Sequence, residues 1–546
     1  MDGNSTTVGG DRPSMLAALQ NSLFVQAFVT VVVVCFCTRI LSSQRFHSIR
    51  RSKGHNILPP TVPYWIPGLR HALSLGWDSK TFMAKCLKKY GDGSPFFLDG
   101  AGQQRMCIIL DPDHIKNALR STKEMDPNPF IHTRILGALM GSPQSAVDYY
   151  QSEESNTDYI QTTHIRQHTT GSNLGQLDKR VFETLKRTIG ETLDSTGEWT
   201  EIPDLYSFIK HHITYAVATT LLGTELVSTY SGLMDDLWTH IEATDQFFLG
   251  LPRIAIPKAY AARDRLLANF RAWSTKSEEL RKHNKVNTVW DPVAGSSLAQ
   301  EREKLYSELP GHDEYARSAQ TLGLLYGGTS LTVPITFWYL YETLRSPDLN
   351  KRVLSEIRNH ADPKTKSYHF MQLTTRPLLQ SLHAETTRLY SSNLTVREVT
   401  TPLYVLDDKY SLPKGTPVFI LNKWAGMYAP GWAKTRAQAL ARPLTTFWAE
   451  RFLVSDGNGD EKKERFSDAG LSGTWMSFGG GEHKCPGRHL ARNIGIVTLA
   501  VLMGELELEV LDVEKARRLD PDPRQKGFGT LVPGGKVAAR IRRRVS

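Results

Sequence analysis

One ten-residue segment constrains this chain more than any other. Residues 478–487 have the sequence FGGGEHKCPG and lead directly into a helical run, RHLARNIGIVTLAVLMGEL. Cys485 therefore stands just before a helix start, where unpaired backbone N–H groups and the helix dipole favour a negatively charged sulfur. Pro486 suits a first helical turn, because its missing N–H would have no partner there. The pattern predicts a cysteine held as a thiolate at the N-terminal end of a helix.

The residues around Cys485 indicate what its sulfur binds. The glycines of the loop are Gly479, Gly480, Gly481 and Gly487. Without side chains they let the backbone lie against a flat group and direct N–H groups at the sulfur. His483 and Lys484 add cationic or polar groups beside it. A thiolate in such a setting is a good axial ligand for haem iron.

Two other interpretations of Cys485 are open. It can be an ordinary buried cysteine after a Gly-rich turn, or it can bind zinc together with His483, although no second Cys/His pair stands at a workable spacing. Against both, four fixed positions match a haem-thiolate signature that chance would produce on the order of once per thousand such chains. These positions are Phe478, Gly481, Cys485 and Gly487.

The loop resembles the haem-binding loop of the cytochromes P450, and the resemblance extends over nearly the whole chain. Glu385 and Arg388 in HAETTRLY match the family's Glu-x-x-Arg pair, and their i, i+3 spacing allows an ion pair on one helix face. The segment FWAERF resembles the family's Pro-Glu-Arg-Phe segment, with Ala449 where proline is usual. By that match Arg451 joins Glu385 and Arg388 in a buried charge network.

The resemblance implies haem b as the cofactor, with Cys485 as the axial thiolate ligand of its iron. Arg397, twelve residues after Glu385, stands where the family has an arginine that binds a haem propionate, and His483 matches a second propionate contact. Arginine suits a planar carboxylate because it donates two parallel hydrogen bonds. The family's earlier Trp/Arg propionate contact has no clean counterpart. The candidates for it are His164, Arg166 and His168.

The segment YARSAQTLGLLYGGTSLTVPITFWYLYETLRSP resembles the family's long central helix over the haem. Gly327 and Gly328 match the small-residue pair that lets this helix approach the oxygen site. The acid and threonine that usually follow, which are implicated in proton delivery, are replaced by Ser330 and Leu331. A leucine cannot relay a proton.

Pro334 offers either a substitute for that pair or a simple kink. It has no N–H, so the carbonyl of Ser330 loses its helical partner. The freed carbonyl can hold an ordered water together with nearby hydroxyls. The hydroxyls, and hence the candidate catalytic residues, are Thr329, Ser330 and Thr332. In the alternative, Pro334 only kinks the helix and these hydroxyls bond back to it.

The remaining pattern predicts a mainly helical body with small peripheral β-sheets, which the resemblance makes a cytochrome P450 fold. Long helices are expected over Leu174–Leu193, Glu314–Leu344 and Arg488–Met503. Residues 142–160 and 286–312 are polar and are expected to be surface loops. Strand-like runs are QRMCIIL, TPLYVL, TPVFIL and GFGTLVPGGKVAARI.

An uncharged run, residues 16–38, lies near the N-terminus and has about the ~20 residues that a bilayer-spanning helix needs. Basic residues follow it at once, so the positive-inside rule places the bulk of the chain in the cytosol. A cleavable signal peptide is the alternative, but the run is long and its basic flank is on the wrong side. We expect one membrane pass in the endoplasmic reticulum, with the Asn4 sequon in the lumen.

The expected organisation has four segments. A lumenal tail, 1–15, precedes the transmembrane anchor, 16–38; a basic stop and a semi-rigid, proline-rich spacer occupy 39–69, and the haem-thiolate catalytic domain occupies 70–546. Five scattered cysteines are too few for a disulfide framework, which favours a reducing compartment.

The formal charge of +10 is spread along the chain, and no aromatic-interleaved basic stripe predicts nucleic-acid binding. The one dense basic cluster is Arg540, Arg542, Arg543 and Arg544, for which a solvated tail and a docking patch are both open.

The resemblance implies a monooxygenase that inserts oxygen into a lipophilic small molecule, a steroid or terpenoid in a secondary-metabolite pathway. Electrons would come from an NADPH-dependent flavoprotein reductase. PYWIPGL and the Pro334, Phe337, Trp338 pattern resemble the branch with bile-acid-forming sterol hydroxylases and prostacyclin synthase. Because that branch also holds a rearrangement enzyme, a reductase-independent isomerase or dehydratase of a peroxide is the alternative. A haem sensor or carrier is a remote one, since no output module is visible.

Overall fold

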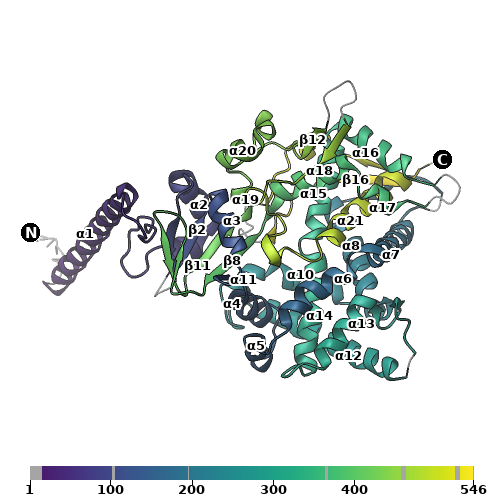
Figure 1. Cartoon of the computed structure of the whole chain (residues 1–546), viewed down its shortest axis with the longest axis horizontal. Coiled ribbons are helices and arrows are strands. Elements are labelled where there is room, and N and C mark those ends of the chain that lie inside the picture. The colour runs from purple at the N-terminus through teal and green to yellow at the C-terminus, as the bar shows by residue number, and fades with distance from the viewer. Residues whose placement is uncertain are drawn as a thin grey trace, which may run out of the picture.

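The computed structural model describes residues 15–100, 105–194, 196–283, 285–362, 367–456, 463–522 and 529–544. This part of the chain forms a mainly helical body with small sheets, and one N-terminal helix projects from it (Figure 1). The predicted fold class, mainly α with small β-sheets, is confirmed. The expected lumenal tail up to residue 14, with its Asn4 sequon, lies outside the described residues.

Helices supply most of the body. Its first half holds α2 (Ala72–Tyr90), α3 (Pro112–Arg120), α4 (Asn128–Phe130), α5 (Gln144–Tyr150), α6 (Ile165–His168), α7 (Gly171–Gly190), α8 (Leu205–Leu222), α9 (Thr224–Thr229), α10 (Leu233–Glu242), α11 (Thr244–Phe248) and α12 (Pro257–Lys282). Its second half holds α13 (Ser297–Ser307), α14 (Glu314–Thr329), α15 (Thr332–Arg345), α16 (Pro347–Asn359), α17 (Phe370–Leu373), α18 (Pro377–Tyr390), α19 (Asn422–Ala425), α20 (Ala429–Arg436), α21 (Arg488–Leu499) and α22 (Val513–Arg517).

The core is built around α15, whose sequence TVPITFWYLYETLR is apolar on most faces. Phe337, Trp338 and Tyr339 are fully buried, and α15 packs against α8, α18 and α21. A helix that is apolar nearly all round has to be covered on every side. The helix that follows Cys485 therefore lies against the predicted central helix in the middle of the body (Figure 1).

A five-stranded sheet lies at the end of the body next to the projecting helix (Figure 1). Its strand order is β1 (Phe96–Asp99), β2 (Arg105–Ile109), β11 (Pro417–Leu421), β8 (Leu394–Val399) and β3 (Met125–Asp126). β11 runs parallel to β2 and antiparallel to β8, so that Val418 stands opposite Cys107 on one side and Arg397 on the other. This register carries Arg397 into the interior.

The other sheets are smaller. They comprise β4 (Thr200–Ile202) with β16 (Ala539–Arg543) and β14 (Leu506–Val510), β5 (Trp290–Asp291) with β6 (Gly295–Ser296), β7 (Ser391–Ser392) with β15 (Gly529–Thr530), β9 (Leu403–Val405) with β10 (Ser411–Pro413), and β12 (Leu453–Asp456) with β13 (Lys463–Phe466). The four runs predicted as strand-like each contain described strands.

Two secondary-structure predictions are wrong. The single helix expected over Glu314–Leu344 is divided into α14 and α15 at residues 330–331. Pro334 explains the break, because it lacks the N–H that would bond to the carbonyl of Ser330. The polar segments 142–160 and 286–312 are not simple loops, since they contain α5 and α13, each of which buries an apolar side against the body.

The projecting helix is α1 (Met15–Arg51), and its apolar part, within Phe24–Arg51, is long and apolar enough to cross a membrane, with none of that window buried. The last turns of α1 pack on the body. Phe46 is buried against Tyr90 with 4.8 Å between ring centroids, and Arg50 pairs with Asp92 at 2.5 Å.

The proline-rich segment after α1 lies on the body instead of standing between it and α1. Val62 is buried, and its N–H donates to the carbonyl of Phe97 in β1 at 3.0 Å. Arg39 of α1 donates to the carbonyl of Pro63 and also lies over the ring of Trp65. The expected spacer is therefore extended, as its prolines dictate, but fixed along its length.

The basic cluster near the C-terminus is part of a sheet. In β16, Arg540 and Arg542 stand opposite Glu509 and Glu507 of β14 and form ion pairs with them. Both guanidinium groups also lie over the ring of Trp199. Cross-strand pairs of this kind stabilise a sheet. In the described residues this cluster is therefore part of a paired sheet and not a solvated tail.

Candidate active site around Cys485

Cys485 is held at the base of α21 by its own backbone. Its N–H donates to the carbonyl of Phe478 at 2.9 Å, which closes the loop. The backbone N–H groups of Gly487 and Arg488 hydrogen-bond to its sulfur. The sequence suggested that Pro486 lies in the first turn of the helix. Because α21 begins at Arg488, Pro486 instead lies just outside it.

The electrostatics of the sulfur follow from two opposing effects. Burial raises the pKa of the Cys485 thiol, while the N–H groups of Gly487 and Arg488 and the charge of Arg488 lower it. In the protein alone burial outweighs the helix start, so the expected thiolate needs a further positive charge. A coordinated metal ion supplies it, because a coordinating thiol is deprotonated outright.

The glycines of the loop serve two different purposes. A Cβ on Gly480 would lie 2.6 Å from the Leu119 side chain of α3, and one on Gly481 would lie 2.4 Å from the Leu119 carbonyl. These two positions therefore let the loop pack on α3, which the sequence did not indicate. At Gly487 nothing lies within 4 Å of a built Cβ, so only this glycine faces open space, as the prediction of a flat ligand requires.

Phe478 is fixed between aromatic side chains behind the loop. Its ring is stacked on His383 of α18 at 6.0 Å and lies edge-on to Trp475 at 6.5 Å. His383 is buried, and neither of its ring nitrogens has a hydrogen-bond partner among the described residues. Burial lowers the pKa of His383 to about 3, so this ring stays neutral and adds no charge near Cys485.

The surroundings of Arg397 indicate whether an anionic group fits beside the cysteine loop. The side chain is buried, and among the described residues it donates only to carbonyls, those of Val396 at 2.9 Å and Gly480 at 3.4 Å. Its Nε has no partner in the described part of the chain. Burial lowers the pKa of Arg397 to about 10, although the charge of Asp126 opposes this. A buried cation without an ion-paired carboxylate is costly unless an anion completes the site.

His483 lies at the same place. It ends the 3₁₀ turn Gly481–His483, and the pKa of its imidazole is lowered first by burial and then by the charge of Arg397. The two predicted propionate contacts are therefore brought together, from β8 and from the cysteine loop. Lys484 instead points to Asp468, 3.7 Å away.

The three candidates on the segment before α7 do not share one environment. His164 and His168 lie together at 4.6 Å between ring centroids, and His168 is within 3.3 Å of Ser297 at the start of α13. Arg166 has a buried Nε without a partner among the described residues. The segment itself touches the cysteine loop, since the hydroxyl of Thr169 donates to the carbonyl of Pro486 at 3.2 Å. Because the Nδ1 of His164 is likewise buried without a partner in the described residues, these contacts favour Arg166 and His164 over His168.

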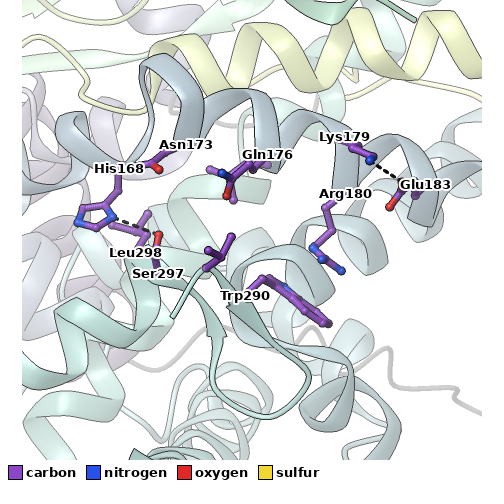
Figure 2. A pocket seen from close by; sticks show the side chains of 11 residues that line it. His168, Asn173, Gln176, Lys179, Arg180, Glu183, Trp290, Ser297 and Leu298 are labelled. Atoms are coloured by element: carbon purple, nitrogen blue, oxygen red, sulfur yellow. Dashed lines mark hydrogen bonds and ion pairs between the residues drawn. The ribbon is translucent and has the colours of Figure 1, made fainter. Parts of the chain in front are cut away.

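A cavity of about 190 Å³ opens beside this segment, between α7 and the start of α13. Figure 2 shows His168 at one end of it and Arg180 above the Trp290 ring at the other, with 3.6 Å between guanidinium and ring centroid. Cys485 does not line this cavity. His168 thus faces a separate hollow, which is a further reason to discount it as a contact of the site.

The family resemblance predicts the distal side of the site where α14 ends. Nothing lies within 4 Å of a Cβ built on Gly327, and this residue is exposed although it lies in the middle of the body. A Cβ on Gly328 would instead lie 3.1 Å from Val217 and 3.3 Å from Leu221 of α8. Of the predicted small-residue pair, only Gly327 opens on free space, and Gly328 serves helix packing.

The three candidate hydroxyls are all buried but are used differently. Thr329 donates to the carbonyl of Leu325 at 2.7 Å, the back-bonding that the kink interpretation expects. The Ser330 hydroxyl instead acts on Tyr326, whose pKa it lowers against the effect of burial. The carbonyl of Thr332 accepts a hydrogen bond from the hydroxyl of Thr336 at 2.8 Å. The side chain of Leu331 is part-buried and lies against Gly529 of β15.

The predicted charge network has the geometry of a fully buried hub. Glu385 accepts from Arg388 at 2.7 and 2.8 Å, from the Nε of Arg451 at 3.0 Å and from the backbone N–H of Trp448 at 3.0 Å. The side chains of all three charged residues are completely buried. Arg451 also donates to four backbone carbonyls, those of Ala439, Arg442, Pro443 and Thr446.

Taken together, the residues present fit a haem group. Cys485 would supply the thiolate ligand, and Arg397 and His483 would supply donors for carboxylates. Gly487 and Gly327 leave open space on two different elements. The zinc interpretation gains no support, since no group of three or more His, Cys, Asp or Glu side chains able to hold a metal occurs in the described residues. Sequence reasoning missed Leu119, His383 and Tyr326, none of which belongs to a local motif.

Comparison with known proteins agrees with this geometry. A family model described as Cytochrome P450 matches residues 296–538. Cytochrome P450 monooxygenase fsoE of Humicola fuscoatra is 29% identical over 543 residues, covering 93% of this chain and 92% of that protein. Cytochrome P450 monooxygenase efuG of Hormonema carpetanum is 27% identical, covering 96% of each. Cholesterol 7-alpha-monooxygenase of Cricetulus griseus is 25% identical, covering 92% and 95%. These similarities support the cytochrome P450 family for this chain, as an oxidoreductase with a branch resembling the sterol hydroxylases.

Proposed function

We propose that this enzyme binds haem b and inserts oxygen into a steroid or terpenoid, taking electrons from an NADPH-dependent flavoprotein reductase. The observation that carries the proposal is that the loop holding Cys485 also contacts Arg397. This buried arginine has no ion-paired carboxylate in the described residues. One relative acts on cholesterol by name. A sterol or a terpenoid of similar size is the substrate class that this relationship favours, in a secondary-metabolite pathway.

In this proposal each residue has a defined task. Cys485 ligates the iron, Phe478 packs behind the loop, and Arg397 and His483 bind the propionates, with Arg166 as the third contact. The bound haem supplies the activation of dioxygen. Gly481 lets the loop pack on α3, and Gly487 leaves space for the ring.

On the distal side, Gly327 leaves room for dioxygen and substrate, and Leu331 presents an apolar surface that excludes water from part of the site. Ser330 is the hydroxyl best placed to hold or pass a proton. Thr332 is the second candidate. Thr329 remains a candidate only if its bond to the Leu325 carbonyl opens, since that bond occupies its proton at 2.7 Å.

A second function, rearrangement of a lipid peroxide without reductase, is favoured by Leu331, which stands where the family has a proton-relaying threonine. The deciding experiment supplies purified protein with cholesterol and a panel of sterols and triterpenes, with and without reductase and NADPH. The proposal expects product only with both, and its new oxygen atom from labelled dioxygen. Conversion of a fatty-acid hydroperoxide without reductase, giving product without oxygen from dioxygen, would establish the second function instead.

The proposed location is the endoplasmic reticulum membrane, with residues 1–15 in the lumen, one span over 16–38 and the body in the cytosol. α1 provides the span, and its exposed apolar surface supports this assignment. In intact microsomes, added protease should then digest the body. Protection of the body would place it in the lumen and contradict this topology.

Two truncations should separate anchoring from folding. Deleting residues 2–38 removes the proposed span but leaves Arg39, Phe46 and Arg50, so we expect a haem-replete protein with weakened membrane binding. Deleting residues 2–51 also removes Phe46, whose burial is worth roughly 3–5 kcal/mol. That protein should lose haem and soluble yield. Equal haem content in both truncations would show that the end of α1 does not stabilise the body.

A further inference from the structure

A row of hydroxyl groups leads away from the site along the end of α14. The phenol of Tyr326 lies 2.8 Å from the hydroxyl of Thr244 at the start of α11. Thr244 also lies 2.7 Å from the carbonyl of Ile241, to which it can donate. The Tyr326 phenol, the Thr244 hydroxyl and the Ile241 carbonyl thus form a hydrogen-bonded line. It joins α14 to the start of α11, which is far away in the sequence.

Ser330 extends this line inward. It lies one helical turn after Tyr326, to whose carbonyl its N–H donates at 2.9 Å. The Ser330 hydroxyl also lowers the pKa of the Tyr326 phenol, as a nearby donor does. Ser330 also comes three residues after Gly327, whose position opens on free space. The row therefore begins beside the open part of the site and ends at α11.

The surroundings keep the hydroxyl groups of this row uncharged. Burial raises the pKa of Tyr326 to about 12, so the phenol keeps its proton and can both donate and accept. His240 of α10 lies edge-on to Tyr326 at 6.0 Å, and burial lowers the pKa of His240 to about 3, so this ring is neutral too. Asp245 follows Thr244 directly, and its charge acts on the Tyr326 phenol at the outer end of the row.

We propose that Ser330, Tyr326 and Thr244 form a proton path from α11 to the space beside Gly327, in place of the acid and threonine that this chain lacks. The inference rests on the proposed monooxygenase function and specifies how its protons arrive. Thr244 first turns its hydroxyl from the carbonyl of Ile241 to Tyr326. Each hydroxyl then passes its own proton inward and takes one from its outer neighbour, with water at the Asp245 end as the source. No hydroxyl gains or loses a proton overall.

The test replaces single hydroxyls and compares matched variants. Tyr326→Phe removes one phenol from α14. Tyr315→Phe is the control, because Tyr315 lies on the same helix, is exposed, and stacks with Arg271 through its ring and not through its hydroxyl. Thr244→Val breaks the outer link, and Thr244→Ser should restore it. Unfolding temperatures identify any variant that is damaged in structure.

The first readout is the ratio of hydrogen peroxide released to product formed, with the panel sterol or triterpene that the wild-type enzyme oxidises. We expect Tyr326→Phe and Thr244→Val to raise the ratio of peroxide to product roughly 10-fold or more. The reason is that each variant removes a positioned proton-transfer group, which contributes at least this much to a rate. Tyr315→Phe and Thr244→Ser should match the wild type. If the wild type forms no reductase-dependent product, the proposed function fails before the path is tested.

The second readout needs no turnover. The infrared stretching band of carbon monoxide in the reduced protein reports polar groups near the ligand, so it should shift in Tyr326→Phe and Ser330→Ala but not in Tyr315→Phe. A wild type that oxidises a sterol, combined with folded Tyr326→Phe and Thr244→Val variants whose coupling and carbon monoxide band are both unchanged, would overturn the proton path and leave the proposed function standing.

Discussion

Replacing Glu385 with alanine should lower the free energy of unfolding by roughly 3–5 kcal/mol, because two buried cations lose their counterion. The protein should lose most of its haem as well. Glu385 accepts four hydrogen bonds, and its side chain is completely buried. Burial already lowers the pKa of Arg451, and the charge of Glu385 is the largest effect that opposes it. In the described part of the chain, Glu385 is the only carboxylate in an ion pair with Arg388 or Arg451.

The loss should also reach the cysteine loop indirectly. Arg451 holds the carbonyls of residues 439–446 together, and Arg388 donates to the carbonyl of Gly426 at 3.3 Å. These segments cover the side of the body on which α18 lies. Unfolding by denaturant and haem content per protein should therefore fall together in Glu385→Ala.

A part-exposed ion pair provides the control for this prediction. Glu356 accepts from Arg376 at 2.7 Å, but both side chains are partly solvated. Glu356→Ala should change the free energy of unfolding by at most about 1 kcal/mol, as is usual for such pairs. A Glu385→Ala protein that is as stable and as rich in haem as Glu356→Ala would show that the buried hub has no special weight.

The sequence predicted the parts of the site that depend on local spacing. The cysteine loop, the i, i+3 pair Glu385 and Arg388, and the approach of Arg397 to His483 all follow from motifs whose geometry is set within a few residues or by one register of the sheet. The broad fold class followed from helical periodicity. The membrane helix followed from a long uncharged run.

What the sequence could not predict depends on partners that are distant in the chain. Gly480 and Gly481 are small because Leu119 approaches them, and Arg540 is paired because β14 presents Glu509 opposite it. The break between α14 and α15 was predicted only in part. The missing N–H of Pro334 predicted a kink, and the structure shows that the helix in fact ends at residue 329 and restarts at residue 332.

The Tyr326 row shows the same limit within the site. Tyr326 directly precedes the glycine pair, yet nothing local indicates that its phenol reaches α11. Thr244 lies 82 residues away and carries no motif at all. A resemblance to a family draws attention to the positions that the family uses, and this chain replaces two of them.

Replacing Cys485 with alanine should give a folded protein that contains almost no haem. The side chain is small and faces the site, so the loop loses its ligand while the Cys485 N–H can still donate to Phe478. Cys37→Ala is the control, because this cysteine is exposed on α1. Haem content by absorbance, with circular dichroism for the fold, separates ligand loss from unfolding.

The most direct test of the site is the carbon monoxide spectrum of the reduced protein. The wild type should show the red-shifted band of thiolate-ligated haem, and Cys485→His, where it retains haem, should show the band of histidine-ligated haem. A Cys485→His or Cys485→Ala protein that kept the thiolate band would contradict the assignment of Cys485 as the iron ligand.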